Sequence, residues 1–420
     1  MNQTRLARLL ILFLVLATTL TGCSTGLLHW TQQKTAAQPK GTAQQQSGSG
    51  FLHTDGATLV DSNCHQVHLS GVNWFGMETT SFAPHGLDVR NWQDMLNQMV
   101  LAGFNTIRLP FTDQFLDPSS MPQGINYHLN PDLVGLHGLS LLDKLIQGAR
   151  QRGLKIILDR HYPTPDQPSP LWYTNEMPES TWIADWVMLA EHYRGNDTII
   201  GADLDGEPHG VTTWGSDDPA TDWHLAAERA GNAILAANPD WLIIVEGIEI
   251  YNHGLFWWGG NLQGAGDYPV YLSEPDKLVY SAHDYGPDVY PQSYFWAANF
   301  PQNLTSVWES HWAYLQEQNQ APVLIGEFGA NTVSDTTVEG VWFRTLMDFM
   351  KQHNMSYTYW AWNPDSSDTG GLLQADWQTL DPAKMSILST YQSPLLDRPT
   401  IKVKEIQQHY TPLRAAQCMD

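Results

Sequence analysis

Two glutamates each follow a short apolar run, and they are the strongest chemical signal in the sequence. Glu207 lies in IIGADLDGEPHG (199–210) and Glu327 lies in PVLIGEFGA (322–330). In a barrel of eight parallel strands, reactive side chains come from the C-terminal ends of different strands, so distant residues can share one cleft. Glycoside hydrolysis needs one carboxyl that holds a proton and one that stays ionised. The pair predicts this chemistry with no metal and no cofactor.

Other polar or aromatic side chains stand at the ends of further apolar runs. They are Arg108, His161, Glu246, His283, Tyr285 and Trp360. A ring of such residues is harder to explain by packing than a single one. Glu246 competes with the two glutamates as an acidic group, and we weigh a supporting role and a purely structural role for it equally. No Cys or His spacing resembles a zinc site, which argues against metal catalysis.

Apolar or β-branched runs alternate with helical patterns from residue 66 onward, which is typical of repeated βα units. Helical spacing with a glycine stop marks 139–153 and 181–195. The eight predicted strands span 67–74, 104–110, 154–161, 198–205, 241–247, 277–285, 322–329 and 357–363. Eight strands close a barrel, so we predict an α/β fold of the (β/α)8 TIM-barrel type.

The composition excludes some partners and favours others. The formal net charge of −23 repels nucleic acid and anionic lipid headgroups, whereas a neutral polysaccharide suits it. The 420 residues include 18 Trp and 16 Tyr, and the clusters FWW (256–258) and YFW (294–296) lie in loop-like surroundings. We expect that rings there can stack on sugars, and nothing demands an oligomer, so we expect a monomer.

Six segments together resemble glycoside hydrolase family 5 over roughly residues 55–390. They are GVNWFGMET (71–79), NTIRLPF (105–111), ILDRHYP (157–163), DLDGEPHG (203–210), IGEFGA (325–330) and WAWNPDSSDTGGLL (360–373). GVNWFGMET and NPDSSDTGG are most similar to the bacterial endoglucanases of that family. The resemblance implies a retaining endo-β-1,4-glucanase that acts on β-glucan, with Glu207 as acid/base and Glu327 as nucleophile.

The resemblance also implies roles for the residues around the two glutamates. Arg108 would pair with the nucleophile and keep it ionised, and Tyr285 would donate a hydrogen bond to it. His161 and His283 would contact sugar hydroxyls and the catalytic carboxylates. Trp360 would form the floor under the sugar beside the scissile bond, whereas Trp74 fits the barrel core equally well.

One position departs from the family pattern. The usual Asn before the acid/base is Gly206 here, so NEP has become GEP. That Asn normally bonds the sugar 2-hydroxyl, a contact that strengthens in the transition state. Asp205 is adjacent, but its side chain should point to the opposite face of the strand. Three alternatives therefore stay open: this endoglucanase, a hydrolase of mannan or mixed-linkage glucan, and a non-catalytic glycan-binding protein.

The N-terminal segment has the pattern of an export signal. Arg5 and Arg8 precede an apolar run (9–20), and LTGC (20–23) resembles a bacterial lipoprotein box in which Cys23 is lipidated. We predict a signal peptide over 1–23. The product is then an outer-membrane or cell-surface lipoprotein, touching the membrane only through its anchor, or otherwise a secreted protein.

The remaining boundaries follow from composition. Residues 24–50 are rich in Gln, Ser and Gly and carry few large apolar side chains, which predicts a flexible linker. The hydrolase barrel is expected over 51–413. Cys64 and Cys418 lie near its two ends, and a disulfide and two separate thiols are equally expected.

Overall fold

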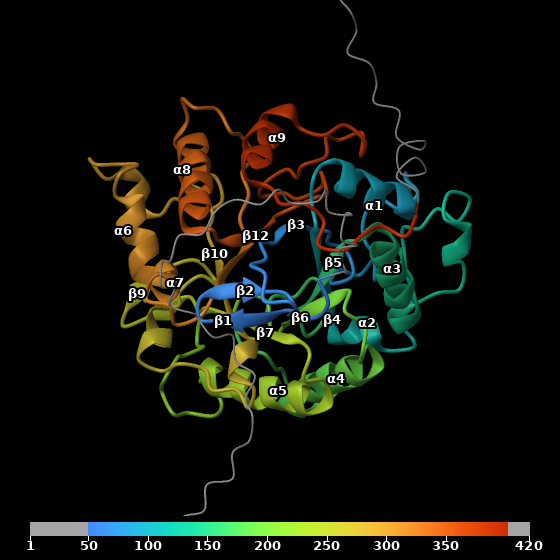
Figure 1. Ribbon diagram of the computed structural model, residues 1–420, viewed down its shortest axis with the longest axis horizontal. Coiled ribbons are helices and arrows are strands. Elements are labelled where there is room, and N and C mark those ends of the chain that lie inside the picture. The colour runs from blue at the N-terminus through green and yellow to red at the C-terminus, as the bar shows by residue number, and fades with distance from the viewer. Residues whose placement is uncertain (1–48, 402–420) are drawn as a thin grey trace, which may run out of the picture. The chain divides into compact units, whose positions relative to one another are not determined.

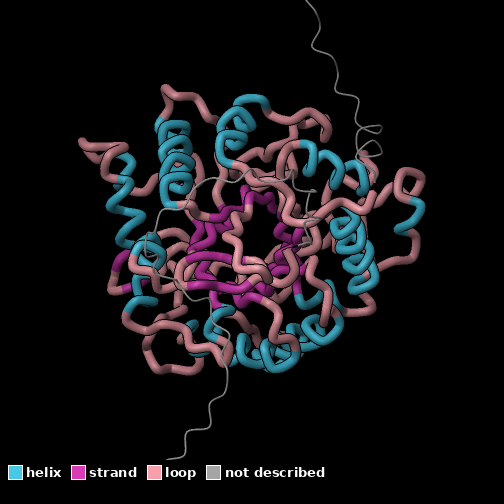
Figure 2. The backbone as a smooth tube through the Cα atoms, in the orientation of Figure 1, coloured by secondary structure: helices cyan, strands magenta, loops and turns pink. Residues whose placement is uncertain are grey.

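The computed structural model describes residues 49–401. Eight parallel strands form a closed barrel in the order β10-β11-β12-β3-β4-β5-β6-β7, and Figures 1 and 2 show the strands ringed by helices. Their bounds are β3 Ser70–Asn73, β4 Thr106–Thr112, β5 Lys155–Tyr162, β6 Ile199–Asp203, β7 Leu242–Glu246, β10 Leu278–His283, β11 Val323–Glu327 and β12 Ser356–Tyr359. The predicted TIM barrel and each of its eight predicted strands are confirmed.

The last barrel strand pairs with the first, which closes the ring. In that pair Tyr357 lies opposite Ser70 and Tyr359 lies opposite Val72. The longest pairing joins β4 and β5, where Thr106 lies opposite Lys155 and Arg108 lies opposite Ile157. The carboxyl ends of these strands therefore meet at one face of the barrel, which is the face where the predicted site residues stand.

Helices surround the strands (Figure 2). The bounds are α1 Trp92–Leu101, α2 Asp113–Leu116, α3 Gly138–Arg152, α4 Glu179–His192, α5 Trp223–Ala237, α6 Leu304–Trp308, α7 Tyr314–Glu317, α8 Val338–His353 and α9 Pro382–Leu388. A π-helix, Glu309–Ala313, joins α6 to α7. The two predicted helices are α3 and α4, and Gly153, whose φ of 74° is left-handed, caps the C-terminus of α3. Within residues 49–401, no helix has the length and apolarity that a membrane crossing requires.

Large indole rings fill much of the layer between strands and helices. Trp172, Trp182 and Trp223 are fully buried, with ring centroids 5.7 to 6.3 Å apart. Trp74 is also fully buried and donates from Nε1 to the carbonyl of His85. Of the two roles weighed for Trp74, the core role is the one observed.

The N-terminal end of the barrel carries a small hairpin that the sequence patterns did not predict. Strands β1 (His53–Asp55) and β2 (Thr58–Val60) pair antiparallel. Beside them, the backbone N–H of Ser49 donates to Asp397 Oδ1 at 2.8 Å, and Lys155 Nζ lies 2.7 Å from Asp397 Oδ2. Because Lys155 is the first residue of β5, both ends of the described chain meet at the face opposite the strand C-termini.

Several predictions fall outside the described residues. These are the signal peptide 1–23, the lipidated Cys23, nearly all of the linker 24–50, and the end of the barrel domain at 413. Cys418 is outside as well, so its pairing with Cys64 stays a prediction.

Candidate active site

Glu327 ends strand β11 and is almost completely buried. Its Oε1 accepts from Arg108 Nη1 at 2.6 Å, and its Oε2 accepts from the Tyr285 hydroxyl at 2.7 Å. Arg108 comes from β4, and Tyr285 lies two residues beyond the end of β10. These two donors, both named by the sequence patterns, fix the orientation of the carboxylate and stabilise its ionised form.

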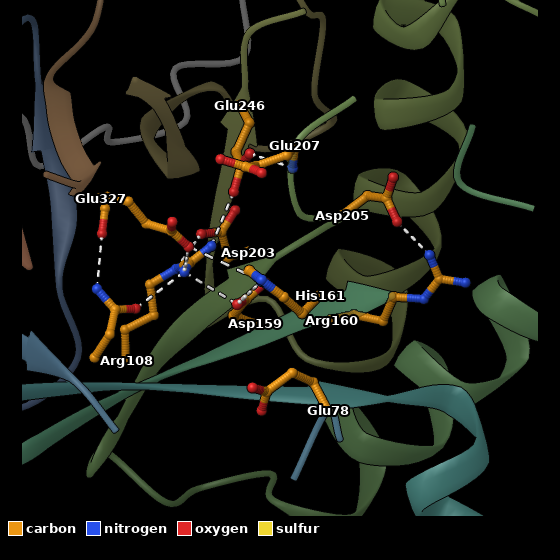
Figure 3. A network of polar contacts seen from close by, with 12 residues as sticks. Glu78, Arg108, Asp159, Arg160, His161, Asp203, Asp205, Glu207, Glu246 and Glu327 are labelled. Atoms are coloured by element: carbon orange, nitrogen blue, oxygen red, sulfur yellow. Dashed lines mark hydrogen bonds and ion pairs between the residues drawn. The ribbon is translucent and has the colours of Figure 1, made fainter. Parts of the chain in front are cut away.

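Arg108 is fully buried and organises four carboxylates (Figure 3). Besides Glu327, its guanidinium lies 2.8 Å from Asp203, 2.9 Å from Glu246 and 3.0 Å from Asp159. A planar guanidinium group donates its hydrogen bonds in fixed directions, and bonds to carboxylates are strong. Arg108 can therefore hold the ends of several strands in register. The layer of side chains around Arg108 is thus an ionic network, whereas Ile157, Ile244 and Leu324 of the same strands belong to an apolar cluster.

Glu207 lies just beyond β6, on a backbone that few non-glycine residues adopt. Its φ is +56°, and its backbone N–H donates to Glu246 Oε2 at 2.6 Å. Its side chain is 19 % exposed, with Oε1 3.0 Å from Nδ1 of His283. One oxygen each of Glu207 and Glu327 and a ring nitrogen of His283 lie within 4.8 Å of one another. The structure therefore brings the two predicted glutamates together.

Of the two predicted histidines, His283 lies 3.0 Å from Glu207 and 3.6 Å from Glu327, and His161 lies 3.9 Å from Glu327. Nδ1 of His161 lies 2.8 Å from Asp159, and Nε2 of His283 lies 3.2 Å from Glu246. Burial would lower the pKa of His161, but the charge of Asp159 raises it to about 9. Burial likewise opposes charge on His283, yet the neighbouring Glu246 and Glu327 raise its pKa well above the ordinary value. Both rings add positive charge next to Glu327.

The environment separates the two glutamates electrostatically. Burial alone would raise the pKa of Glu327, but the charges of His283, Arg108 and His161 lower it to about 2. Burial raises the pKa of Glu207, and the negative charge of Glu327 raises it further, against the lowering effect of His283. Near neutral pH, Glu327 is ionised, and Glu207 holds its proton more tightly than an exposed glutamate does.

A cleft of about 980 Å³ lies over the two carboxyls, and Trp360 forms part of its lining. The Trp360 ring is parallel to that of His161, at 5.5 Å and 9°, and to that of Phe75, at 5.4 Å and 10°. A flat apolar ring in this position presents a face suited to the C–H-rich face of a pyranose. Cleft and ring together suit a carbohydrate better than a charged ligand.

The two aromatic clusters of the sequence have different surroundings. Phe256 and Trp257 are largely buried and Trp258 is 41 % exposed, and all three line the cleft. Phe295 is buried, whereas Trp296 is 63 % exposed and is not among the residues that line the cleft. Within the first cluster, Trp258 is the ring with a large exposed area in the cleft, and its stacking on a sugar stays a prediction.

Gly206 packs against His161 so closely that a side chain would not fit. A Cβ at this position would lie 2.8 Å from Nδ1 and 2.9 Å from the carbonyl oxygen of His161. The family Asn therefore cannot be added here unless His161 moves. Asp205 points away from the site, as expected, and its carboxylate contacts Arg160 (Figure 3).

Sequence reasoning missed several residues of this network. Asp159 stands two positions before His161 in ILDRHYP, so the two share a strand face, and that alternation was a usable signal. Asp203 ends β6 in the same way. Glu246, left between two roles, contacts Arg108, His283 and the Glu207 backbone. Glu78 is buried, which raises its pKa to about 7, and no pattern indicated it.

Three groups of acidic and histidine side chains have spacings that a metal ion would accept. They are Asp159 with His161 and Glu327, Glu207 with His283 and Glu327, and Asp159 with Asp203 and Glu246. Arg108 donates into the third group and to Glu327, so a cationic side chain already compensates these carboxylates. Their chemistry is that of an ionic network around two glutamates.

A parallel barrel with two opposed glutamates at its C-terminal face defines a glycoside hydrolase of the retaining type. Residues 60–366 match the family described as Cellulase (glycosyl hydrolase family 5), and the chain belongs to that family. The protein named Endoglucanase from Paenibacillus polymyxa is 49 % identical over 358 residues, which are 84 % of this chain and 90 % of that one. The Major extracellular endoglucanase of Xanthomonas campestris pv. campestris is 42 % identical over 338 residues, 79 % of this chain and 69 % of that one.

Solved structures give the same result. A variant of the endocellulase from Pyrococcus horikoshii, in complex with cellotetraose, has a TM-score of 0.77 and 41 % identity, over 82 % of this chain and 99 % of that one. The catalytic domain of the Xanthomonas campestris pv. campestris endoglucanase also has a TM-score of 0.77, with 40 % identity over 81 % and 99 % of the two chains. At these identities the similarity includes the sequence as well as the fold.

Proposed function

We propose that this protein is an endo-β-1,4-glucanase that hydrolyses internal glucosidic bonds with retention of configuration. The observation that carries the proposal is the pairing of Glu207 and Glu327, with carboxyl oxygens within 4.8 Å and pKa values shifted in opposite directions. Retaining enzymes keep their two carboxyls about 5–5.5 Å apart, whereas inverting enzymes leave about 6.5–9.5 Å for a water. The short separation supports direct attack by one carboxylate.

In the first step, the Glu327 carboxylate attacks the anomeric carbon while the glycosidic C–O bond breaks. Glu207 gives its proton to the leaving oxygen, and a glycosyl-enzyme ester remains on Glu327. Esterification removes the charge that raises the pKa of Glu207, so this residue is then suited to act as a base. In the second step, Glu207 takes a proton from water, the water oxygen attacks the anomeric carbon, and Glu327 leaves as a carboxylate.

The surrounding residues hold these groups ready for reaction. Arg108 and Tyr285 orient Glu327 and keep it ionised before attack. His283 lies 3.0 Å from Glu207 and 3.6 Å from Glu327, between the two carboxyls. Trp360 would support the sugar ring from below, with His161 stacked beside it. Such prior organisation lowers the reorganisation needed in the transition state.

The substrate is proposed to be a β-1,4-glucan. The relatives named above carry the names endoglucanase and endocellulase, and one of their solved structures holds cellotetraose. The same barrel serves many substrates through its loops, so mannan and mixed-linkage glucan are the substrates to compare. A merely glycan-binding role gives no chemical reason for the opposed pKa shifts of Glu207 and Glu327.

The test is reducing-end release from carboxymethylcellulose by the purified protein, together with Glu207→Ala and Glu327→Ala. We expect activity in the parent, loss in both variants, and NMR spectra in which the first product is the β-anomer. A 2-deoxy-2-fluoro glycoside with a good leaving group should leave a covalent adduct on Glu327, because the fluorine slows hydrolysis of the glycosyl-enzyme. A parent that binds cellulose but releases no reducing ends from glucan, mixed-linkage glucan or mannan would refute an enzymatic role, and an α-anomeric product would refute retention.

We also propose that the protein is exported and lipidated at Cys23, in line with the extracellular relative from Xanthomonas. Metabolic labelling with a palmitate analogue in a bacterial host should label the parent protein and leave Cys23→Ser unlabelled. Equal labelling of both forms would refute this site. Absence of label in the parent would favour an ordinary secretory signal.

A further inference from the structure

His209 joins the backbone of Glu207 to the wall of the cleft. Its Nδ1 lies 2.7 Å from the carbonyl oxygen of Glu207, two residues earlier in the chain. Because a carbonyl oxygen can only accept, Nδ1 must carry a hydrogen and donate it. The residue is 9 % exposed and the bond is partly buried, so water has limited access to it.

The bond matters because the Glu207 backbone is in an unfavourable conformation. A φ of +56° for a residue with a Cβ costs on the order of 1 kcal/mol and persists only where neighbours impose it. Glu246 Oε2 accepts from the N–H of Glu207, and His209 donates to its carbonyl oxygen. The two contacts hold both peptide groups of the residue, and these set the direction of its side chain.

The flat face of the His209 ring packs on an aromatic residue of the cleft. Its ring lies flat on Trp258, with centroids 3.8 Å apart and an interplanar angle of 7°. Trp258 lines the cleft and is 41 % exposed. The backbone N–H of His209 donates to the carbonyl of Pro170, and its own carbonyl accepts from Thr212. The imidazole therefore has one defined position between the Glu207 backbone and Trp258.

We propose that His209 is a positioning residue for proton donation by Glu207. Its N–H holds the left-handed backbone that aims the Glu207 carboxyl at the leaving oxygen, and Trp258 holds the imidazole in place. This inference rests on the proposed function, because it takes Glu207 as the proton donor. His209 is not among the residues that line the cleft, so it acts through the position of Glu207 rather than by direct contact with substrate.

The leaving group separates this role from a general structural one. Cleavage of cellotetraose expels a sugar alkoxide that needs the proton of Glu207, whereas 2,4-dinitrophenyl β-cellobioside expels a phenolate that needs none. The parameter kcat/KM reports steps up to formation of the glycosyl-enzyme, so later base catalysis by Glu207 does not enter. A fault in proton donation lowers kcat/KM for cellotetraose alone.

The main variant is His209→Phe, which keeps a flat ring against Trp258 and removes the N–H donor. We expect kcat/KM for cellotetraose to fall roughly tenfold, as the loss of one hydrogen bond predicts, with the dinitrophenyl substrate within about twofold of the parent. His209→Asn is the matched control, because its amide keeps a donor and lacks the ring. The ratio of the two kcat/KM values in this control should stay within about threefold of the parent.

Glu207→Ala, measured in parallel, separates the two proposals. If Glu207→Ala lowers kcat/KM equally for both substrates, Glu207 is not the proton donor and the proposed function fails. Suppose that Glu207→Ala lowers kcat/KM for cellotetraose alone. The role of His209 is then refuted if His209→Phe lowers kcat/KM for neither substrate, or lowers it equally for both. If His209→Phe does not fold, His209→Asn decides, and a selective tenfold loss in that variant, which retains a donor, would overturn the proposal.

Discussion

Arg108 and Arg160 stand on neighbouring strands, are both fully buried, and are both surrounded by acids, yet they have different tasks. Arg108 contacts Glu327, Asp159, Asp203 and Glu246 inside the barrel. Arg160 contacts Asp113 and Asp205, away from the cleft (Figure 3). Residue type and burial do not distinguish a functional arginine from a structural one. The face of the strand from which the side chain projects does.

The largest effect is expected for Arg108→Met. Buried carboxylates left without their cation should lower the free energy of unfolding by about 3–5 kcal/mol. Loss of the donor to Glu327 should reduce kcat on cellotetraose by roughly 10²–10³. Urea unfolding and steady-state kinetics measure the two losses. Arg108→Lys is the control, because lysine keeps the positive charge but lacks the planar guanidinium group. A kcat close to that of the parent in Arg108→Met would contradict the role given to Arg108.

Arg160→Met should separate stability from turnover. We expect a similar loss of about 3–5 kcal/mol in the free energy of unfolding, because Asp113 and Asp205 lose their shared partner. Well below the unfolding temperature, kcat should stay within roughly tenfold of the parent, since Arg160 contacts neither Glu207 nor Glu327. A fall in kcat as large as that of Arg108→Met would remove the distinction between the two arginines.

Gly206 lies where the two networks meet, because its N–H donates to the carbonyl of Arg160 and its Cα faces His161. Gly206→Ala should lower kcat by roughly 10–100-fold, since the added Cβ displaces His161 and small displacements near a reaction centre are costly. Gly206→Asn adds the same Cβ together with an amide. Higher kcat in Asn than in Ala would show that the amide contributes, whereas kcat above the parent would show that His161 accommodates a side chain.

The smallest expected effect is a change in the pKa of Glu207 when Glu327 is replaced. Glu327→Gln removes the negative charge that raises the pKa of Glu207, so that pKa should fall. NMR titration of labelled glutamate side chains, with Glu207→Gln for assignment, measures the change. In the parent, the shift directions predict that kcat/KM falls as pH rises through the raised pKa of Glu207, and on the acid side only as pH approaches about 2. A Glu207 pKa unchanged by Glu327→Gln would show that the charge of Glu327 does not contribute to it.

The sequence patterns sufficed for the barrel and for the paired glutamates. Runs of Ile, Leu and Val before Glu207 and Glu327 mark buried parallel strands whatever the loops do. The family resemblance gave Arg108 a role at the nucleophile. Arg160 also lies in a predicted strand, but no sequence pattern gave it a role. The direction of each side chain depends on how the barrel closes, and that is a property of all eight strands together.

Contacts between loops were beyond sequence reasoning for a different reason. His209 and Trp258 are far apart in the chain, and their stacking depends on where the two segments that follow β6 and β7 come to lie. The clearance between Gly206 and His161 is likewise a distance, and no spacing along a chain gives it. Sequence motifs identified the two reacting glutamates, whereas the residues that position them follow only from the three-dimensional structure.

Ser49, Asp397 and Lys155 meet at the N-terminal end of β5 and join the two ends of the described chain there. The chain enters the barrel on the side remote from Glu207 and Glu327. The cleft is lined by residues between His161 and Asp368, so neither end of the described chain stands at its rim. A long glucan can therefore lie along the cleft without meeting either end of the described chain.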